Sequence, residues 1–228
     1  VQNDLGLKNL YKLVTRSNIE FFSRVPRIPR SILDQHREGL IIGTGDTSGD
    51  VIVTLIEKGR EEALRKAKYY DYIEIQPTAN YSPMLETELI ASTEKLHDIL
   101  KDMISIGDEL HLPVVVTGDV KYTNPEDKIY RDILIATQPG NPQNRTALPD
   151  LYFRTTQDLL DDYAFLGEAT AKKVVIDNTH TVVNMLETIK PLKSGSYPPN
   201  IPGAGDELTK RTFETAKKWY GDPLPDVI

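Results

Sequence analysis

The stretch from residue 113 to residue 127, PVVVTGDVKYTNPED, constrains the fold of this chain more than any other. Its three consecutive valines, residues 114–116, are typical of a short strand that is buried on both faces of a parallel sheet. Asn124 and Pro125 then predict the start of a helix, because asparagine caps helix N-termini and proline suits the first helical position. Strand, loop and helix form one βα unit, and the loop after the strand is where such folds place their chemistry.

The same alternation of strands and helices recurs along the middle of the chain. Apolar periodicity predicts strands at residues 40–42, 72–76 and 114–116, and helices at residues 6–22, 31–36, 51–57, 61–68, 84–89, 93–110, 125–137, 157–165, 168–175, 178–186 and 206–220. The expected N-caps include Ser31, Ser92 or Thr93, Thr155 or Thr156, and Asn178 or Thr179. The pattern indicates an α/β fold with a parallel sheet or a β/α barrel. Three strands are too few to close a barrel, so we expect either further strands in this chain or a barrel that sequence outside it completes.

The C-terminal region has a different composition from the rest. Four prolines lie between Pro191 and Pro202, which predicts a linker over residues 191–205. Residues 206–228 are then expected to form a helix and a tail. The sequence therefore predicts an α/β domain over residues 1–190, followed by the linker and the helix.

The composition excludes several classes of protein. The chain has no cysteine, so it has no disulfide, no thiolate zinc site and no cysteine nucleophile, and this suits a cytoplasmic protein. Its longest apolar runs are four or five residues, which is too short to span a bilayer. A net charge of −7 does not favour a stand-alone nucleic-acid binder, because phosphate contacts need clustered cations.

The first forty residues are locally basic. Arg24, Arg27 and Arg30 lie close together in a proline-containing segment, so they are candidate contacts to phosphate or DNA. The alternative is that they belong to a solvated loop and helix face.

Three carboxylates are predicted at or near the carboxyl ends of the strands. They are Asp46, Glu74 and Asp119, and in a barrel those ends converge. Clustered carboxylates would suit Mg²⁺ or Mn²⁺, whereas Zn²⁺ would also require imidazoles. The four histidines are expected elsewhere: His36 and His111 before strands, His97 on a solvent-facing helix surface, and His180 near a helix start.

Lys121 follows Asp119 by two residues and places an ammonium group near any such site. It would repel a metal ion, and it would pair either with Asp119 or with a phosphate. The glycine-containing loop at residues 43–50 leaves two alternatives open, a phosphate cradle at a helix N-terminus or a plain tight turn. No serine–histidine–acid arrangement is recognisable, and no catalytic residue is assigned.

Several runs of sequence, in order along the chain, together resemble one family. They include GLKNLYKLVTRSNIEFFSRVPRIPRSIL, HREGLIIGT, YYDYIEIQP, PVVVTGDVKY, LYFRTTQDLL and YPPNIPGA. These runs resemble the PHP (polymerase and histidinol phosphatase) domain of PolC, the Gram-positive-type replicative DNA polymerase III alpha subunit. The resemblance implies part of a distorted (β/α)7-type barrel, namely the portion after the exonuclease domain that interrupts the PHP domain. The histidine-rich metal motifs of the family would lie upstream of residue 1.

The resemblance also implies what the acidic residues could do. Metal-binding PHP domains have a G-D-V-H type motif on the central strand, and here Asp119 matches a ligand position while Lys121 replaces the histidine. Asp46 stands where the family often has a cysteine, and Glu74 in EIQP matches the family. A metal site would thus be degenerate. No cofactor is expected in this stretch itself, and Mg²⁺ or Mn²⁺, or alternatively Zn²⁺, is expected if the site is active.

The sequence leads to one main hypothesis and one rival. The main hypothesis is that the chain is a fragment of a replicative polymerase in which the PHP part is a structural and interaction scaffold. Its expected partners are the exonuclease and polymerase parts of the parent chain, DNA through that parent, and other replisome subunits. The rival is an active metal-dependent phosphoesterase that uses Asp46, Glu74 and Asp119 to activate water.

Overall fold

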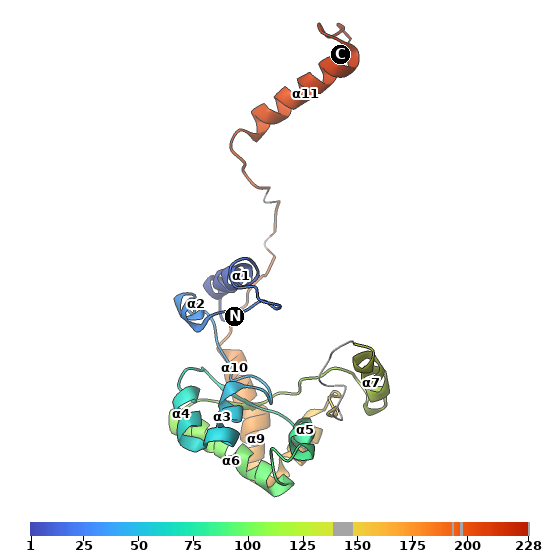
Figure 1. Cartoon of the computed structure of the whole chain (residues 1–228). Coiled ribbons are helices and arrows are strands. Elements are labelled where there is room, and N and C mark those ends of the chain that lie inside the picture. Colours follow the sequence, from blue (N-terminus) through green and yellow to red (C-terminus); the bar gives the residue numbers. More distant parts are fainter. Residues whose placement is uncertain (139–147, 193, 197, 228) are drawn as a thin grey trace. The chain divides into compact units, whose positions relative to one another are not determined.

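The computed structural model describes residues 1–138, 148–192, 194–196 and 198–227 (Figure 1). The chain divides into two compact units, Val1–Ile189 and Lys190–Ile228. Residues 193 and 197 of the predicted linker, and residue 228 of the tail, lie outside the described residues.

The first unit is mainly helical around a small sheet. Its elements are α1 (Asp4–Ile19), α2 (Arg30–Gln35), α3 (Asp50–Lys58), α4 (Arg60–Ala67), β1 (Ile73–Ile75), η1 (Thr78–Tyr81), α5 (Ser82–Glu86), α6 (Thr93–Leu110), β2 (Val114–Val116), η2 (Pro125–Asp127), α7 (Lys128–Ala136), α8 (Thr156–Asp162), η4 (Ala164–Leu166), α9 (Glu168–Lys172), the π-helical turn η5 (Lys173–Asp177) and α10 (Asn178–Asn184). The second unit contains α11 (Ala204–Tyr220).

The sheet of the described residues pairs β1 with β2 in parallel. Ile73 aligns with Val114 and Ile75 with Val116. All three valines of β2 are buried, as the sequence predicts for a strand covered on both faces. The α/β class with a parallel sheet is therefore confirmed at this level.

The predicted strand at residues 40–42 is wrong. The backbone of Ile42 instead pairs with Asp71, since its N–H donates to the Asp71 carboxylate at 2.8 Å and its carbonyl accepts from the Asp71 N–H at 2.8 Å. Only Gly43 reaches the sheet, through an isolated parallel bridge to Tyr72. A side-chain partner thus takes the donor that a strand ladder would use.

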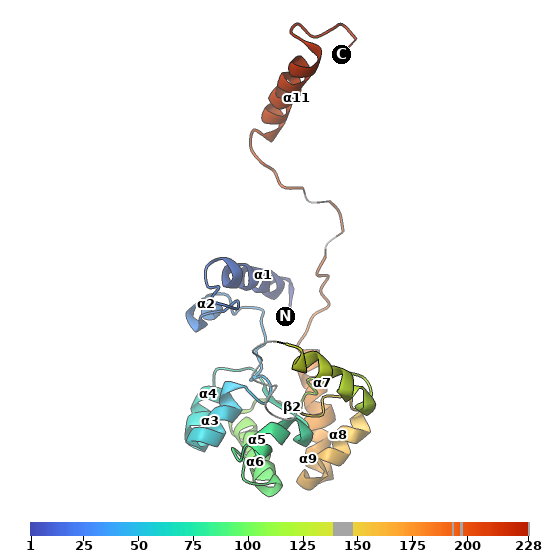
Figure 2. The ribbon, with the colours of Figure 1, turned by 45° about the vertical axis from the view of Figure 1, so that its right-hand side comes forward.

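The core lies between the sheet, the helices α3 and α4 that precede it, α6 and the α9–η5 segment (Figure 2). Leu96, Leu100, Met103 and Ile106 of α6 are fully buried. Gly107 allows α6 to approach β2 closely, because a Cβ at that position would lie 2.3 Å from a methyl carbon of Val114. The spacing of these residues at every third or fourth position is the apolar face that the sequence predicts for this helix.

Two of the predicted helix starts are wrong. Asn178 does not cap a new helix, because α9, η5 and α10 run on as one helical segment. Its side-chain N–H instead donates to the Val114 carbonyl at 2.8 Å and ties this segment to β2. Ser31 does not cap α2, which begins at Arg30 after Pro29 without a side-chain cap.

Two other predicted caps are confirmed. The Ser92 hydroxyl accepts from the N–H of Lys95 at 3.2 Å. The Thr155 hydroxyl accepts from the N–H of Asp158 at 3.2 Å, and the Asp158 carboxylate accepts from the N–H of Thr155 at 2.7 Å. Each side chain satisfies a donor that the first helical turn leaves free.

The helix α1 belongs to the first unit through backbone contacts. A Cβ at Gly6 would lie 1.8 Å from the carbonyl oxygen of Gly39, so the two backbones touch. The N–H of Gln2 donates to the Gly39 carbonyl at 2.8 Å, and the N–H of Glu187 donates to the Gln2 carbonyl at 2.8 Å. The N-terminal segment is thus tied to two distant parts of the unit.

The described residues contain no helix that combines the length and the apolar character needed to cross a bilayer.

The core position of Leu100 leads to a stability prediction. We expect Leu100→Ala to lower the free energy of unfolding of the first unit by about 2–5 kcal/mol, because it leaves a cavity among buried side chains. The matched control is Leu192→Ala, whose side chain is 88% exposed, and we expect a change within about 0.5 kcal/mol. Urea unfolding followed by circular dichroism measures both. Equal effects of the two variants would contradict the assigned core.

Candidate functional site

Glu74 occupies the centre of β1 and is held by hydrogen bonds to two threonines. Its N–H donates to the Thr44 hydroxyl at 2.9 Å, and its carboxylate accepts from the Thr117 hydroxyl at 3.1 Å. Thr44 comes from the loop before α3 and Thr117 directly follows β2. The side chain therefore lies where the three predicted strands approach one another, but within its strand and not at its end.

Asp46 lies in the loop between residue 43 and α3 and is exposed. One carboxylate oxygen accepts from both the N–H and the hydroxyl of Ser48, at 2.8 and 2.5 Å. A Cβ at Gly49 would lie 2.3 Å from the carbonyl oxygen of Thr44, so only glycine fits where the loop doubles back. This geometry is that of a tight Asx-type turn, which agrees with the plainer of the two alternatives for the loop.

Asp119 and Lys121 form an ion pair just beyond β2. The Lys121 ammonium lies 2.6 Å from a carboxylate oxygen of Asp119, and both side chains are partly exposed. Asp119 has a φ of 45°, a left-handed conformation that aspartate tolerates better than most residues. The lysine backbone is fixed as well, because its N–H donates to the Leu151 carbonyl at 2.8 Å. Of the two partners expected for this lysine, the structure contains the carboxylate.

The three predicted acids do not gather into one metal-binding group. Among the described residues, no set of three or more carboxylate, imidazole or thiolate side chains is placed to hold a metal ion. Their assignment as ligands therefore stays a prediction. His97, which was expected to face solvent, is partly buried and stacks on the ring of Phe165 with centroids 3.7 Å apart.

Sequence reasoning missed a buried amide pair beside these acids. Gln76 and Asn80 are each 3% exposed, and the Asn80 side-chain N–H donates to the Gln76 side-chain oxygen at 3.0 Å and to the Gly118 carbonyl at 3.2 Å. The remaining Asn80 oxygen is buried without a hydrogen-bond partner in the described part of the chain. The one signal in the sequence is Gln76, a polar residue directly after β1, whereas Asn80 lies in η1. The pair links the loops that follow β1 and β2.

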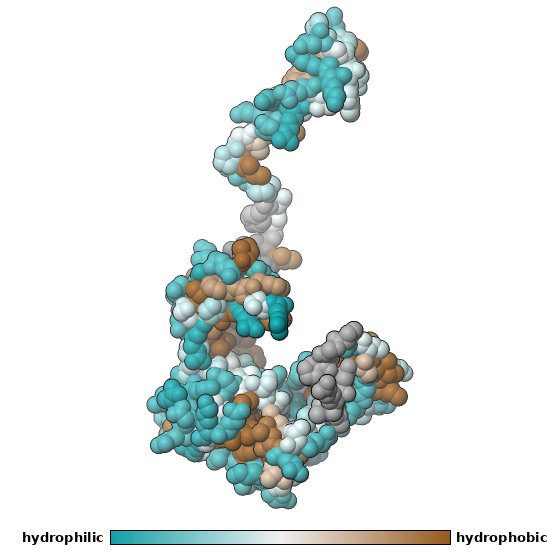
Figure 3. Space-filling view, in the orientation of Figure 1, coloured by the Kyte–Doolittle hydropathy of each residue, from teal (hydrophilic) through white to brown (hydrophobic). Residues whose placement is uncertain are grey.

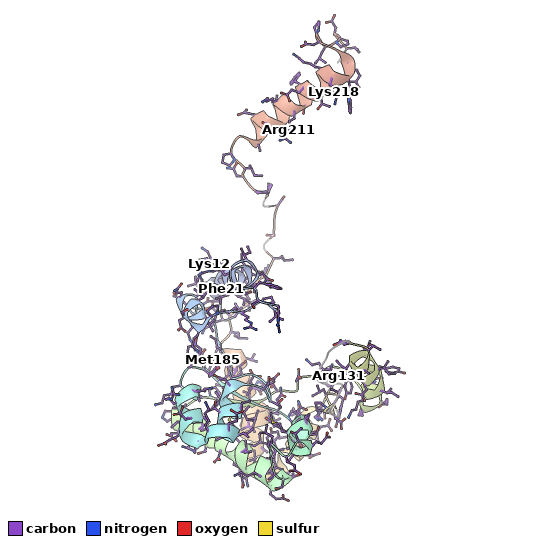
Figure 4. The ribbon with its side chains drawn as sticks, in the orientation of Figure 1. Lys12, Phe21, Arg131, Met185, Arg211 and Lys218 are labelled. Atoms are coloured by element: carbon purple, nitrogen blue, oxygen red, sulfur yellow. The ribbon has the colours of Figure 1, made fainter. Side chains whose placement is uncertain are left out.

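The predicted phosphate contacts fall into two groups. Arg30 stacks on the Tyr69 ring at 3.9 Å and lies 3.8 Å from the Asp50 carboxylate, so it is engaged inside the first unit. Arg24 and Arg27 are exposed, and the structure gives them no ion pair with any described residue. Figure 4 marks Lys12 and Phe21 in the same N-terminal segment. Only Arg24 and Arg27 of these arginines are available to a partner.

Comparison with protein families identifies the class of domain. The PHP domain family matches residues 1–78, which are therefore PHP-domain sequence. Asp119 and Lys121 lie outside the matched part.

Relatives at 44–47% identity cover the whole chain. DNA polymerase III PolC-type of Listeria welshimeri is 47% identical over 228 residues, that of Oceanobacillus iheyensis 45% over 227, and that of Staphylococcus aureus 44% over 228. In each case the match spans all of this chain and 16% of the relative. The chain therefore belongs to the PolC-type DNA polymerase III family, as its sequence motifs suggest, and it corresponds to a fragment of such a polymerase.

The tyrosines around the sheet lead to a prediction about pH. Burial and, to a smaller extent, the Glu74 carboxylate raise the pKa of Tyr72 to about 12, and burial together with Asp50 raises the pKa of Tyr70 to about 12. Both are neutral in the folded state, so their contribution to stability is complete below pH 10 and is lost as the pH rises toward about 12.

We therefore expect the free energy of unfolding to fall between pH 10 and 12, and Tyr72→Phe to fall less steeply than the parent chain. Urea unfolding at fixed pH steps measures this. An unchanged slope in Tyr72→Phe would show that Tyr72 does not titrate in this range.

Proposed function

We propose that this stretch is a structural and interaction scaffold within a PolC-type polymerase and not a metal-dependent phosphoesterase. The observation that carries the proposal is the ion pair between Lys121 and Asp119, whose charged atoms lie 2.6 Å apart. A divalent ion that uses Asp119 would have to displace the ammonium group or accept its repulsion. Mg²⁺ and Mn²⁺ prefer sets of oxygen ligands, and here a nitrogen cation occupies one carboxylate.

The local contacts of the other two acids support the same conclusion. Asp46 directs one oxygen to the Ser48 turn, and Glu74 accepts from the Thr117 hydroxyl. Each contact fixes a loop or strand end. The three acids therefore make structural contacts that do not require a metal ion.

We also propose that the first unit is part of a distorted (β/α)7-type barrel that other sequence completes. The parallel pair β1–β2 and the bridge from Gly43 to Tyr72 support this, since each leaves a sheet edge that a further strand could extend. Residues 1–190 would then be the later part of the PHP domain, residues 191–205 the linker and residues 206–228 the lead into the polymerase core.

The activity of the whole protein follows as a further part of the proposal. The relatives are named as DNA polymerases, and this chain spans 16% of their length. We infer that the parent acts in the cytoplasm in DNA replication, by template-directed nucleotidyl transfer with 3′–5′ exonuclease activity and with other replisome subunits as partners. The residues that perform this chemistry would lie outside the present stretch.

The scaffold proposal predicts that the chain takes up no stoichiometric Mn²⁺ and does not hydrolyse phosphomonoesters in its presence. We expect Asp119→Asn to change the free energy of unfolding by less than about 1 kcal/mol, because the ion pair is partly exposed. Equilibrium dialysis with elemental analysis, a phosphatase assay and urea unfolding test these points.

The matched control is Asp150→Asn, which removes a carboxylate that lies 2.7 Å from the Lys128 ammonium. Stoichiometric Mn²⁺ that is lost in Asp119→Asn and kept in Asp150→Asn would establish the phosphoesterase rival.

A second candidate function, contact with DNA, has its own supporting observation. Residues 1–30 carry six Lys and Arg against two Asp and Glu, a local charge of +4 in a chain of net charge −7. Arg24 and Arg27 are exposed in this segment, and the neighbouring Phe22 is 58% exposed. Free guanidinium groups beside an exposed aromatic ring suit a single-stranded nucleic acid.

We expect the double variant Arg24→Glu, Arg27→Glu to weaken binding of a single-stranded oligonucleotide by about tenfold or more at low salt and to reduce the salt dependence. The control, Arg65→Glu with Lys68→Glu, makes the same charge change on exposed residues of the α4 region. Fluorescence anisotropy at several salt concentrations measures both. Equal loss in the two variants would mean that only net charge matters and that these arginines form no site.

A further inference from the structure

The first unit contains a partly enclosed cavity between α3, the start of α4 and α6. Its volume is about 250 Å³, and all the residues that line it belong to the first unit. Leu55 of α3, Ile90 and Ile99 of α6 form its apolar floor and are all buried in the core. Figure 3 shows hydrophobic surface among α3, α5 and α6, next to hydrophilic surface. A group that enters this cavity would therefore contact the core itself.

The rim of the cavity is built by two unusual backbone conformations and one anchored side chain. Gly59, between α3 and α4, has a φ of 86°, and a Cβ there would meet nothing within 4 Å. Glu88 has a φ of 58°, and the residue after it, Leu89, lines the cavity while half exposed. Arg60 donates to the Ser105 hydroxyl at 3.1 Å and to the Glu109 carboxylate at 2.7 Å. These features hold the cavity open without a ligand, as in preformed binding sites.

Two charged side chains of α6 flank the apolar floor. Lys95 and Asp102 both line the cavity, four residues before and three residues after Ile99. Seven residues of α-helix rise about 10 Å, so their backbones lie two turns apart. Neither side chain has an ion pair with another residue that the structure describes, whereas the charge of Arg60 is offset by Glu109. The cavity thus presents one unpaired cation and one unpaired anion beside an apolar surface.

Size and charge together define the chemistry of a ligand. An apolar cavity of about 150 Å³ can bind benzene, so 250 Å³ has room for a phenyl or a branched aliphatic group. A monoanion would satisfy only Lys95, and a monocation would satisfy only Asp102. A free amino acid carries both charges at one end, and with a charge-assisted hydrogen bond of about 2.8 Å on each side it spans a distance of the order that separates the two residues.

We propose that this cavity binds a free amino acid with a large apolar side chain. Its side chain would pack on the floor of Leu55, Ile90 and Ile99, and gain the free energy of apolar burial. Its carboxylate would pair with Lys95 and its ammonium group with Asp102. The proposal depends neither on the scaffold assignment nor on the contact with DNA.

Titration of the present chain with three probes, followed through the methyl signals of Ile90 and Ile99 in NMR spectra, tests the proposal. L-phenylalanine carries both charges, 3-phenylpropionate carries only the carboxylate, and 2-phenylethylamine carries only the ammonium group. We expect L-phenylalanine to shift both methyl signals and to bind at least about tenfold more tightly than either of the other probes, because each of them lacks one charge-assisted hydrogen bond.

Two substitutions on α6 separate the two charges. Lys95→Gln should weaken L-phenylalanine and 3-phenylpropionate by about tenfold and leave 2-phenylethylamine within about twofold. Asp102→Asn should weaken L-phenylalanine and 2-phenylethylamine instead. The matched controls, Lys172→Gln and Asp177→Asn, make the same charge changes at exposed positions outside the cavity, and all three affinities should stay within about twofold.

Four outcomes contradict the proposal. L-phenylalanine could leave both methyl signals unmoved, or the three probes could bind equally and regardless of Lys95→Gln and Asp102→Asn, which would make the cavity an apolar depression only. An equal loss in Lys95→Gln and Lys172→Gln would reduce the effect to net charge. Nuclear Overhauser contacts from residues 190–228 to the Ile99 methyl groups in the free chain would show that the chain itself fills the cavity.

Discussion

The burial of β2 on both faces is the constraint on which the first unit depends. A strand of three valines gains its stability only when helices cover each side of it, so α6 packs against it through Gly107, and the α9–η5–α10 segment is tied to it through Asn178. Because the strand is fixed, the position of its end also fixes where the following loop begins. The loops after β1 and β2 then lie side by side, joined by the amide pair of Gln76 and Asn80.

The contacts of the three carboxylates support the scaffold proposal. Carboxylates near strand ends are common metal ligands, but each carboxylate can accept only a few hydrogen bonds or ion pairs at once. Asp119 has the Lys121 ammonium, Asp46 has its own turn, and Glu74 has a threonine from β2's end. Each contact replaces what a metal would supply, namely charge neutralisation and fixed geometry.

The two units differ in how many of their residues are buried, and this difference fits a chain that is part of a larger polymerase. The first unit has its own core, whereas no residue of α11 is buried. Exposed arginines in the N-terminal segment form a surface whose charge suits polyanions.

Local patterns in the sequence determined the elements whose signals are short-range. The valine run, the periodicity of α6 and the caps at Ser92 and Thr155 follow from side-chain chemistry within a few residues. The motifs also indicated the family. Asp119 was one of the two partners that the sequence allowed for Lys121, the other being a phosphate.

Only the tertiary structure decided the features that depend on distant residues. Residues 40–42 are as apolar as a strand, yet the Asp71 carboxylate takes a donor that a ladder needs, and no local pattern reveals a partner 29 positions away. Asn178 is a good cap by its chemistry, but the Val114 carbonyl, 64 residues distant, takes its amide instead. The contact of the Asn80 amide with the Gly118 carbonyl, 38 residues distant, was missed for the same reason. Propensity is a property of a few neighbouring residues, whereas a hydrogen-bond partner is chosen by whatever packing brings near, and packing is settled by the whole chain at once.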